Sequence, residues 1–242
     1  MPQAAVKVNR LLPSAVTEGN QTPLRGGRYA EAFTIPMGFG AYPLVQEGTY
    51  FKAINATPGT GIAQTIQTTF LSTNGVFMIL NGDAASGKHL VMDYIRLINT
   101  VVGTTTTRSE AVLAVDNTNR FSAGGSTLTA VNANMDVATS SIATVRFGAL
   151  TLTAESGSVR RLSRFQLRTA IMVQFEEFII SFGRPTLGGF NTLSGTNGQR
   201  MMVDAGPVVI GPGNHSLIVH LWNPGNATTA PSWEVEAGWW ER

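Results

Sequence analysis

The segment with the clearest chemical motif is residues 82–89, which read GDAASGKH. Their glycines and lysine have the spacing of a phosphate-binding P-loop, and an apolar run at 76–80 precedes them. A P-loop also needs a hydroxyl residue after the lysine to hold magnesium, and a helix whose N-terminus faces the phosphates. Here His89 follows Lys88, and residues 90–101 have the pattern of a strand. We therefore interpret the segment as a turn between two strands, with a nucleotide site as the lesser alternative.

Other residue types that support catalysis or metal binding are scattered. His215 and His220 differ in parity along one expected strand, so their side chains point to opposite faces and do not share a metal. The chain has no Cys and no Gly-x-Ser-x-Gly nucleophile elbow. We expect no enzyme activity, no cofactor and no metal centre. Calcium binding stays open, because loop carboxylates far apart in sequence can meet in space: Asp93, Asp116 and Asp136.

The densest charge cluster consists of Arg160, Arg161, Arg164 and Arg168, with Phe165 among them. On a strand, positions 160, 164 and 168 share a face, and a helical period also gives a basic stripe. Arginine makes bidentate contacts with carboxylates and phosphates at interfaces. Three interpretations stay open, in falling order of preference: contact with an acidic partner surface, a solvated sheet edge, or contact with packaged nucleic acid.

The composition favours a chain that works in an assembly. Charged residues make up 13% of the sequence, against about 25% in typical globular proteins. Such a surface is poor at keeping copies apart, although a compositional habit of the genome explains it equally well. The net charge of +2 is too small to indicate a nucleic-acid partner. Without a signal-like N-terminus or an apolar stretch of spanning length, we expect a soluble protein with no membrane partner.

Residues 1–43 are expected to form an extended N-terminal arm. Pro, Gly, Gln and Arg are frequent there and break any helical or strand period. The segment is nevertheless more apolar than disorder favours, with Tyr29 and Phe33 as examples. We therefore expect the arm to lie against its own domain or a neighbouring subunit, which makes both aromatic residues candidates for an interface.

Residues 44–242 have the pattern of one all-β domain, an antiparallel β-sandwich of jelly-roll type. Short runs rich in Val, Ile, Thr, Phe and Tyr alternate with Gly, Asn, Pro and Ser clusters, and no long amphipathic helix is visible. The expected strands are 49–53, 64–70, 76–80, 89–101, 110–115, 126–130, 142–152, 164–173, 178–182, 200–210, 215–222 and 232–240.

The last two expected strands read as the clearest hairpin. The turn residues Asn-Pro-Gly-Asn at 223–226 separate two alternating runs. Trp233 and Trp239 share one face of the returning strand, and Trp240 lies on the other with the glutamates. Trp240 is thus an interface candidate, since tryptophan is frequent at binding hot spots. Burial under the arm of the same chain is an equal alternative.

Several stretches resemble structural proteins of tailed bacteriophages. They are TPLRGGRY at 22–29, EGTYFKA at 47–53, TPGTGIA at 57–63, DNTNRFSAGG at 116–125, NANMD at 132–136 and WEVEAGWWER at 233–242. The resemblance implies a β-sandwich or jelly-roll subunit that decorates the head or forms part of the tail or fibres. It supplies no catalytic residues. The major shell subunit of tailed phages has a long helix, and its absence from this pattern argues against that role.

We therefore expect a non-enzymatic structural subunit of a virus particle, assembled in the host cytoplasm and resident in the virion. A capsid decoration (cement) or minor capsid protein is the preferred role, with other virion proteins as partners and a homo-oligomer, possibly a trimer, as the assembly. The alternative is a tail-fibre or receptor-binding β module that binds carbohydrate. That alternative needs exposed aromatic residues beside polar loops, and Tyr94, Trp222 and Trp240 are its candidates.

Overall fold

The computed structural model describes residues 45, 47–103, 109–168, 174–183, 200–225 and 228–242. From Gly48 to Arg242 they belong to one compact unit. The arm expected over residues 1–43 lies outside the described residues, and so do Tyr29 and Phe33. Within the described part, no helix is long and apolar enough to cross a membrane.

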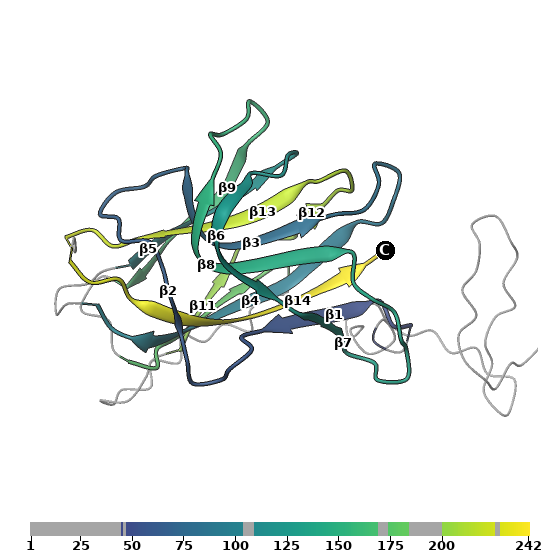
Figure 1. The fold of residues 1–242 in the computed structure, drawn as a ribbon, viewed down its shortest axis with the longest axis horizontal. Coiled ribbons are helices and arrows are strands. Elements are labelled where there is room, and N and C mark those ends of the chain that lie inside the picture. Colours follow the sequence, from purple (N-terminus) through teal and green to yellow (C-terminus); the bar gives the residue numbers. More distant parts are fainter. Residues whose placement is uncertain (1–44, 46, 104–108, 169–173, 184–199, 226–227) are drawn as a thin grey trace, which may run out of the picture. The chain divides into compact units, whose positions relative to one another are not determined.

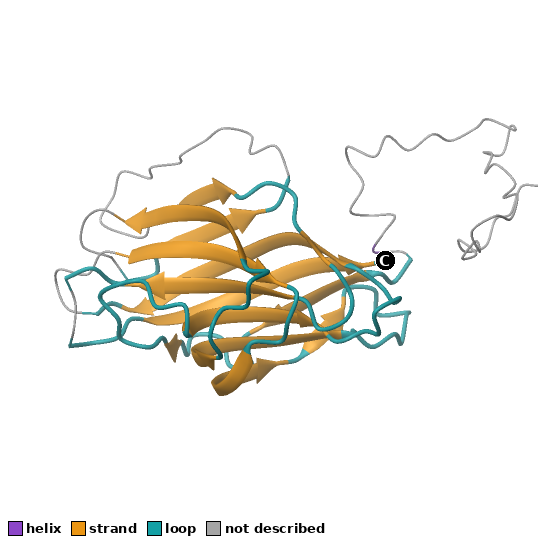
Figure 2. Ribbon diagram, turned by 90° about the horizontal axis from the view of Figure 1, so that it is seen from above, coloured by secondary structure: helices purple, strands orange, loops and turns teal. Residues whose placement is uncertain are grey.

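The unit is an all-β sandwich of two sheets, as the sequence predicted (Figures 1 and 2). The eight-stranded sheet has the order β11-β10-β4-β14-β1-β7, with β12 beside β4 and β2 beside β14. Its strands are β1 (Tyr50–Ile54), β2 (Ile62–Ala63), β4 (Leu90–Val101), β7 (Ala130–Asn132), β10 (Glu177–Ser181), β11 (Arg200–Asp204), β12 (Val209–Ile210) and β14 (Ser232–Glu241). All its pairs are antiparallel except β10 with β11.

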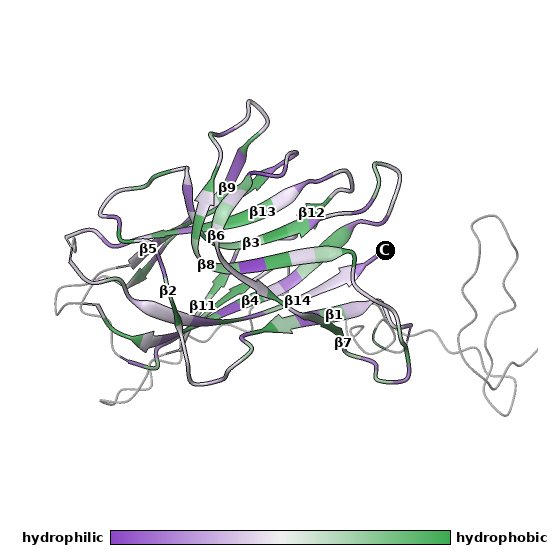
Figure 3. Cartoon of the chain, viewed as in Figure 1, coloured by the Kyte–Doolittle hydropathy of each residue, from purple (hydrophilic) through white to green (hydrophobic). Residues whose placement is uncertain are grey.

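The six-stranded sheet is antiparallel and has the order β6-β8-β3-β13-β5-β9. Its strands are β3 (Asn74–Asn81), β5 (Ser109–Asp116), β6 (Phe121–Leu128), β8 (Ala143–Leu152), β9 (Arg160–Arg168) and β13 (Ser216–Trp222). In Figure 1, β3 and β13 lie above β14 and β1. Figure 3 shows β3 and β13 as largely hydrophobic, which fits their central position in the sheet.

The main core lies between the sheets, because alternate residues of each central strand point inward. Leu217, Val219 and Leu221 of β13 face Trp233 and Trp239 of β14 across this core, and all five are buried. The expected alternation of β14, with both tryptophans on the buried face, is confirmed.

The expected hairpin between residues 215–222 and 232–240 is wrong. β13 belongs to the six-stranded sheet, whereas β14 lies between β4 and β1 in the other. The side chain of Asn223 donates to Ser109 Oγ at 2.6 Å and accepts from the amide of Gln64. Gln64 in turn accepts from the indole N–H of Trp233 at 2.8 Å. These buried contacts hold the chain where it passes from one sheet to the other.

The strand expected at 64–70 is also wrong, since these residues form a connection between β2 and β3. Gln67 is buried and donates to the backbone oxygen of Leu221, and Phe70 packs against two rings of β13. The apolar and amide side chains of this stretch therefore anchor a loop to the sheet instead of alternating along a strand.

Candidate functional site

The face of the six-stranded sheet that points away from the other sheet is crossed by connections. The chain leaving β5 must pass β13, β3 and β8 to reach β6, and it does so on this outer face, where Ser216 Oγ donates to the oxygen of Thr118 at 3.0 Å. The connection from β8 to β9 meets it there, since Ser156 Oγ donates to Asp116 Oδ1 at 2.6 Å. Outer-face residues of β13 such as His220 are therefore buried.

Arg120 ties these crossing segments together. Its side chain is 1% exposed, and its Nη2 donates to the oxygens of Ser72 at 2.7 Å and Thr153 at 2.8 Å. The Asp116 carboxylate lies 3.8 Å from its Nε. Burial lowers the pKa of Arg120, although the acidic groups of Glu155 and Asp116 oppose that effect. Its charge is thus used inside the protein, not offered to a ligand.

Beside the crossing segments lies a cluster of Phe70, Trp222, Arg161 and Arg164, which we call the arginine–aromatic cluster. The rings of Phe70 and Trp222 meet edge to face with centroids 5.7 Å apart. The guanidinium of Arg161 lies 5.1 Å from the Phe70 centroid, and that of Arg164 lies 5.9 Å from the Trp222 centroid. Cations at these distances are attracted to the faces of aromatic rings. Two arginines are thereby held side by side over an apolar base.

A β-bulge in β9 explains which arginines join the cluster. Ser163 pairs with Leu113 but Arg161 pairs with Ala114, so Leu162 is the extra residue. The bulge brings Arg161, instead of Arg160, to the face of Arg164. The expectation that positions 160, 164 and 168 share a face is therefore wrong.

Arg160 and Arg168 lie on the same strand but outside the arginine–aromatic cluster. Arg160 is exposed and its backbone pairs with Val115. The backbone of Arg168 pairs with Ser109, and its side chain lies outside the described residues. β9 is an edge strand of the described sheet.

Each clustered arginine has an acidic neighbour. Arg161 Nη2 lies 2.6 Å from Glu155 Oε2, and Arg164 pairs with Glu110. The arginine side chains are 53% and 70% exposed, so solvent screens both pairs and each contributes little stability. An incoming carboxylate can share the exposed guanidinium groups with these glutamates. The cluster can therefore bind an acidic surface without disrupting the fold.

His220 lies beneath the cluster and carries no charge at neutral pH. Burial lowers its pKa to about 4. Its Nδ1 lies 2.7 Å from the backbone oxygen of Asn74, and because a carbonyl only accepts, neutral His220 holds its proton on Nδ1. The Phe70 ring and the imidazole meet edge to face with centroids 5.3 Å apart. His220 thus supports the ring that carries Arg161.

The outer face of the eight-stranded sheet carries a second aromatic group. Trp240 lies on the face opposite the core, as predicted; it is half-buried, and its ring centroid lies 5.1 Å from that of Tyr50. Tyr94 lies nearby, across Gly238: a Cβ there would stand 2.3 Å from Tyr50 Oη and 2.7 Å from Tyr94 Cε1. Glycine is required at this position so that both tyrosine rings can lie against the sheet.

Glu236 joins that face into a charged network. It accepts from Lys52 Nζ at 3.3 Å, from Arg96 Nη1 at 3.1 Å and from the hydroxyl of Tyr94. Burial raises the pKa of Glu236, but these hydrogen bonds and charges outweigh it, and the pKa lies below its ordinary value. Glu236 is therefore an ionised acceptor in this network. The three aromatic residues expected for a carbohydrate site do not lie together: Tyr94 and Trp240 are on this sheet, and Trp222 is on the other.

The P-loop-like segment holds its own carboxylate where a phosphate would bind. Asp83 Oδ1 accepts from the N–H of Ala84 and Oδ2 from that of Lys88, both at 2.9 Å. Hydrogen bonds from the backbone of Lys88 and Ala84 lower the pKa of Asp83. The strand β4 follows the segment at Leu90, as expected. These two backbone donors of the segment are thus already engaged.

The scattered metal-ligand candidates do not meet in the described residues. His89 is in a loop, His215 precedes β13 and His220 is buried in it. No group of three or more His, Cys, Asp or Glu side chains there has the arrangement of a metal site. Asp93 instead accepts from the hydroxyl of Tyr50 at 2.8 Å, and Asp116 is taken up by the crossing segments.

Comparisons with models of known protein families, with curated proteins and with solved structures found no match. The candidate site therefore stands on its geometry. Sequence reasoning identified the arginines but missed Phe70, which it placed in a strand, and Trp222 as the ring beneath Arg164. The arginines and the rings come together because β9 lies next to β5 and β5 lies next to β13, and this sheet order could not be predicted from the sequence.

Proposed function

We propose that the chain is a non-enzymatic structural subunit of a virus particle that binds neighbouring virion proteins, as a capsid decoration (cement) or minor capsid protein. The observation that carries the proposal is the arginine–aromatic cluster at the edge strand β9. Arginine and tryptophan are the residues most frequent at binding hot spots, and an exposed guanidinium favours an acidic protein surface. The proposal includes homo-oligomers, possibly trimers, and a location in the virion.

The strand pairing supports the finer assignment to the jelly-roll type. A jelly roll is a ribbon of antiparallel pairs rolled on itself. Here the pairs β6 with β8, β5 with β9, β4 with β10 and β3 with β13 are nested one within the next, as such a ribbon requires. The roll departs from the simplest form, because β8 also pairs with β3 and β14 adds beside β4.

The alternative function, a tail-fibre or receptor-binding module for carbohydrate, is favoured by one observation. Trp240 and Tyr94 are half-buried on the outer face of the eight-stranded sheet beside ionised Glu236. A sugar ring stacked on such a surface would find both an apolar face and polar groups.

The test uses virus particles purified from the source of the chain. Mass spectrometry should find the chain in the particles, and cross-linking should join β9 or its surroundings to a virion protein. For the recombinant full-length chain, light scattering at micromolar concentration should give an oligomer. A monomer that is absent from the particles would refute the proposal.

Variants distinguish the two functions. Arg161→Glu combined with Arg164→Glu should abolish rebinding to particles stripped of the chain. Lys88→Glu also reverses a positive charge, in an exposed loop, and should leave rebinding intact. Trp240→Ala should leave rebinding intact. A glycan array that binds the parent chain but not Trp240→Ala would support the alternative instead.

A further inference from the structure

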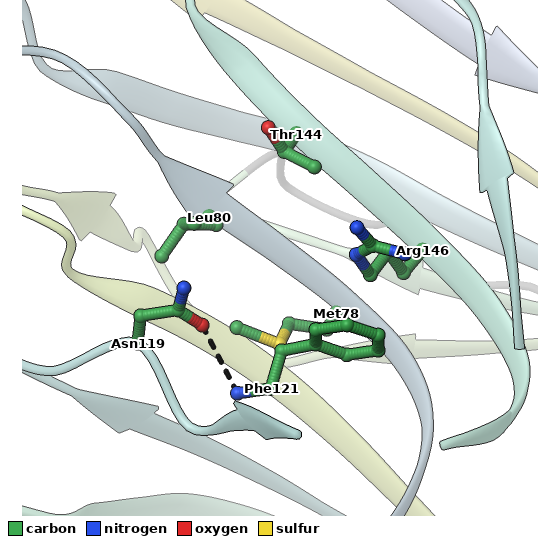
Figure 4. A pocket seen from close by; sticks show the side chains of 6 residues that line it. All are labelled: Met78, Leu80, Asn119, Phe121, Thr144 and Arg146. Carbon is green, nitrogen blue, oxygen red and sulfur yellow. Dashed lines mark hydrogen bonds between the residues drawn. The ribbon is translucent and has the colours of Figure 1, made fainter. Parts of the chain in front are cut away.

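A small pocket opens on the outer face of the six-stranded sheet, on the side of β3 and β8 (Figure 4). Its volume is about 220 Å³. The lining residues come from β3, from β8, and from the end of the β5–β6 connection with the first residue of β6: Met78, Leu80, Asn119, Phe121, Thr144 and Arg146. None of them belongs to the arginine–aromatic cluster, which lies over β13 and β9.

The strand register brings the walls together. Met78 pairs with Arg146 and Leu80 with Thr144, so these four side chains share the outer face. The connection from β5 then enters β6 at Phe121, and Asn119 Oδ1 accepts the Phe121 N–H at 3.0 Å, which fixes that turn (Figure 4). The pocket is therefore built from paired strands and an anchored turn.

The floor of the pocket is apolar. Met78 belongs to a small cluster of buried side chains on this face, and Leu80 and Phe121 pack against it while staying partly exposed. An outer sheet face is usually polar when it meets only water. The apolar floor therefore favours an occupant with an apolar side chain.

Arg146 supplies the charge of the site. Its guanidinium lies 3.8 Å from the centroid of the Phe121 ring. Figure 4 shows its nitrogen atoms directed into the space between the lining side chains. Within the described residues Arg146 has no ion pair, unlike Arg161 and Arg164. Stacking occupies one face of the guanidinium and leaves its N–H groups free in the plane, where they match a carboxylate.

The size of the pocket limits what it can hold. Pockets for drug-sized ligands measure roughly 300–1,000 Å³. At about 220 Å³ this one accommodates a single side chain instead. We infer that the pocket binds an acidic segment of a partner protein, which places an apolar side chain over Met78 and Leu80 and an adjacent carboxylate on Arg146. This inference does not depend on the partner being a virion protein.

The test compares two capped peptides, acetyl-Gly-Phe-Asp-Gly-amide and the same peptide with Asn in place of Asp. Binding to the full-length chain is followed by the backbone amide NMR signals of Phe121, Thr144 and Arg146. The Asp peptide should shift these signals with a dissociation constant of about 1 mM. The dissociation constant of the Asn peptide should be at least about fivefold higher.

Substitution of the arginine should remove that preference. Arg146→Gln should weaken the Asp peptide about fivefold and leave the Asn peptide unchanged, and Arg146→Lys should fall between, because lysine keeps the charge without the planar fork. Arg160→Gln, an exposed arginine on another strand, is the matched control and should bind as the parent does. If Arg146→Gln does not fold, the peptide pair on the parent chain still decides.

Equal binding of the two peptides, or binding of neither, would overturn the inference. Self-association of the parent chain that is lost in Arg146→Gln would also overturn it, because a second copy would then be the occupant. Each of these outcomes is separate from the particle experiment, in which the arginine–aromatic cluster is tested.

Discussion

Replacing Arg120 by methionine should destabilise the fold more than any loss of a surface charge. Arg120 is 1% exposed and holds the segments that cross the outer face of the six-stranded sheet. Its Nη2 donates to the backbone oxygens of Ser72 and Thr153, and Nε also donates to Thr153 at 3.2 Å. Methionine fills much of the same volume but offers no donor. The substitution thus leaves the Asp116 carboxylate and the carbonyls of Ser72 and Thr153 without the guanidinium.

The expected loss is about 3 kcal/mol. Removing one partner of a buried ion pair costs roughly 3–5 kcal/mol, because the remaining charge is left uncompensated. Asp116 keeps the hydroxyl donors of Ser156 and Ser158, at 2.6 Å and 2.9 Å, which places the estimate at the lower end. These two carbonyls can also turn partly toward water once the segments loosen.

The measurement is urea unfolding followed by tryptophan fluorescence. With a dependence of about 3 kcal/mol per molar urea, the midpoint of Arg120→Met should fall by about 1 M. Arg164→Met is the control: its side chain is 70% exposed, so the loss should stay under about 1 kcal/mol. If the two variants unfold at the same urea concentration, Arg120 does not hold the crossing segments as described.

Three further outcomes are expected. Gly238→Ala should cost about 1–3 kcal/mol in urea unfolding, because its Cβ would stand 2.3 Å from Tyr50 Oη; unchanged stability would contradict the packing. The folded-state pKa of His220, about 4 against 6.5, means that the unfolded chain binds its proton first, so stability should fall by about 3 kcal/mol as pH drops from about 6.5 to 4. His220→Gln should flatten that part of the stability profile. Combined Arg161→Gln and Arg164→Gln should change the free energy of unfolding by less than about 1 kcal/mol, yet the variant should no longer bind to particles. If the variant loses stability together with binding, the two arginines serve folding alone.

The parts of the fold that depend on local alternation could be predicted from sequence. The inward tryptophans of β14 and the outward Trp240 follow directly from a period of two residues. The strand after residues 82–89 was predicted for the same reason. It occupies the position at which a P-loop needs a helix. These properties belong to a single strand and do not require knowledge of its neighbours.

What could not be predicted depends on which strands pair. The residues 223–226 carry ordinary turn chemistry, yet Asn223 bonds to Ser109 and to Gln64, residues more than a hundred positions away. The turn signal is the same whether the next strand returns in one sheet or enters the other. Likewise, the extra residue at Leu162 is defined by the opposite strand β5, so no pattern within β9 predicts that Arg161 joins Arg164.

Both proposed binding sites follow from the way the connections cover one face of the sandwich. Because β5 and β6 lie on opposite sides of β13, β3 and β8, the chain between them must cross that face, and the strands beneath become apolar to pack against it. Where the cover ends, partly exposed apolar surface remains. At each margin an arginine lies over an aromatic ring: Arg161 over Phe70 on one side, and Arg146 over Phe121 on the other. Such an arginine shields the ring with its flat face and keeps N–H groups directed outward. The requirement to seal the edge of a buried face thus also produces two positions at which a carboxylate can bind.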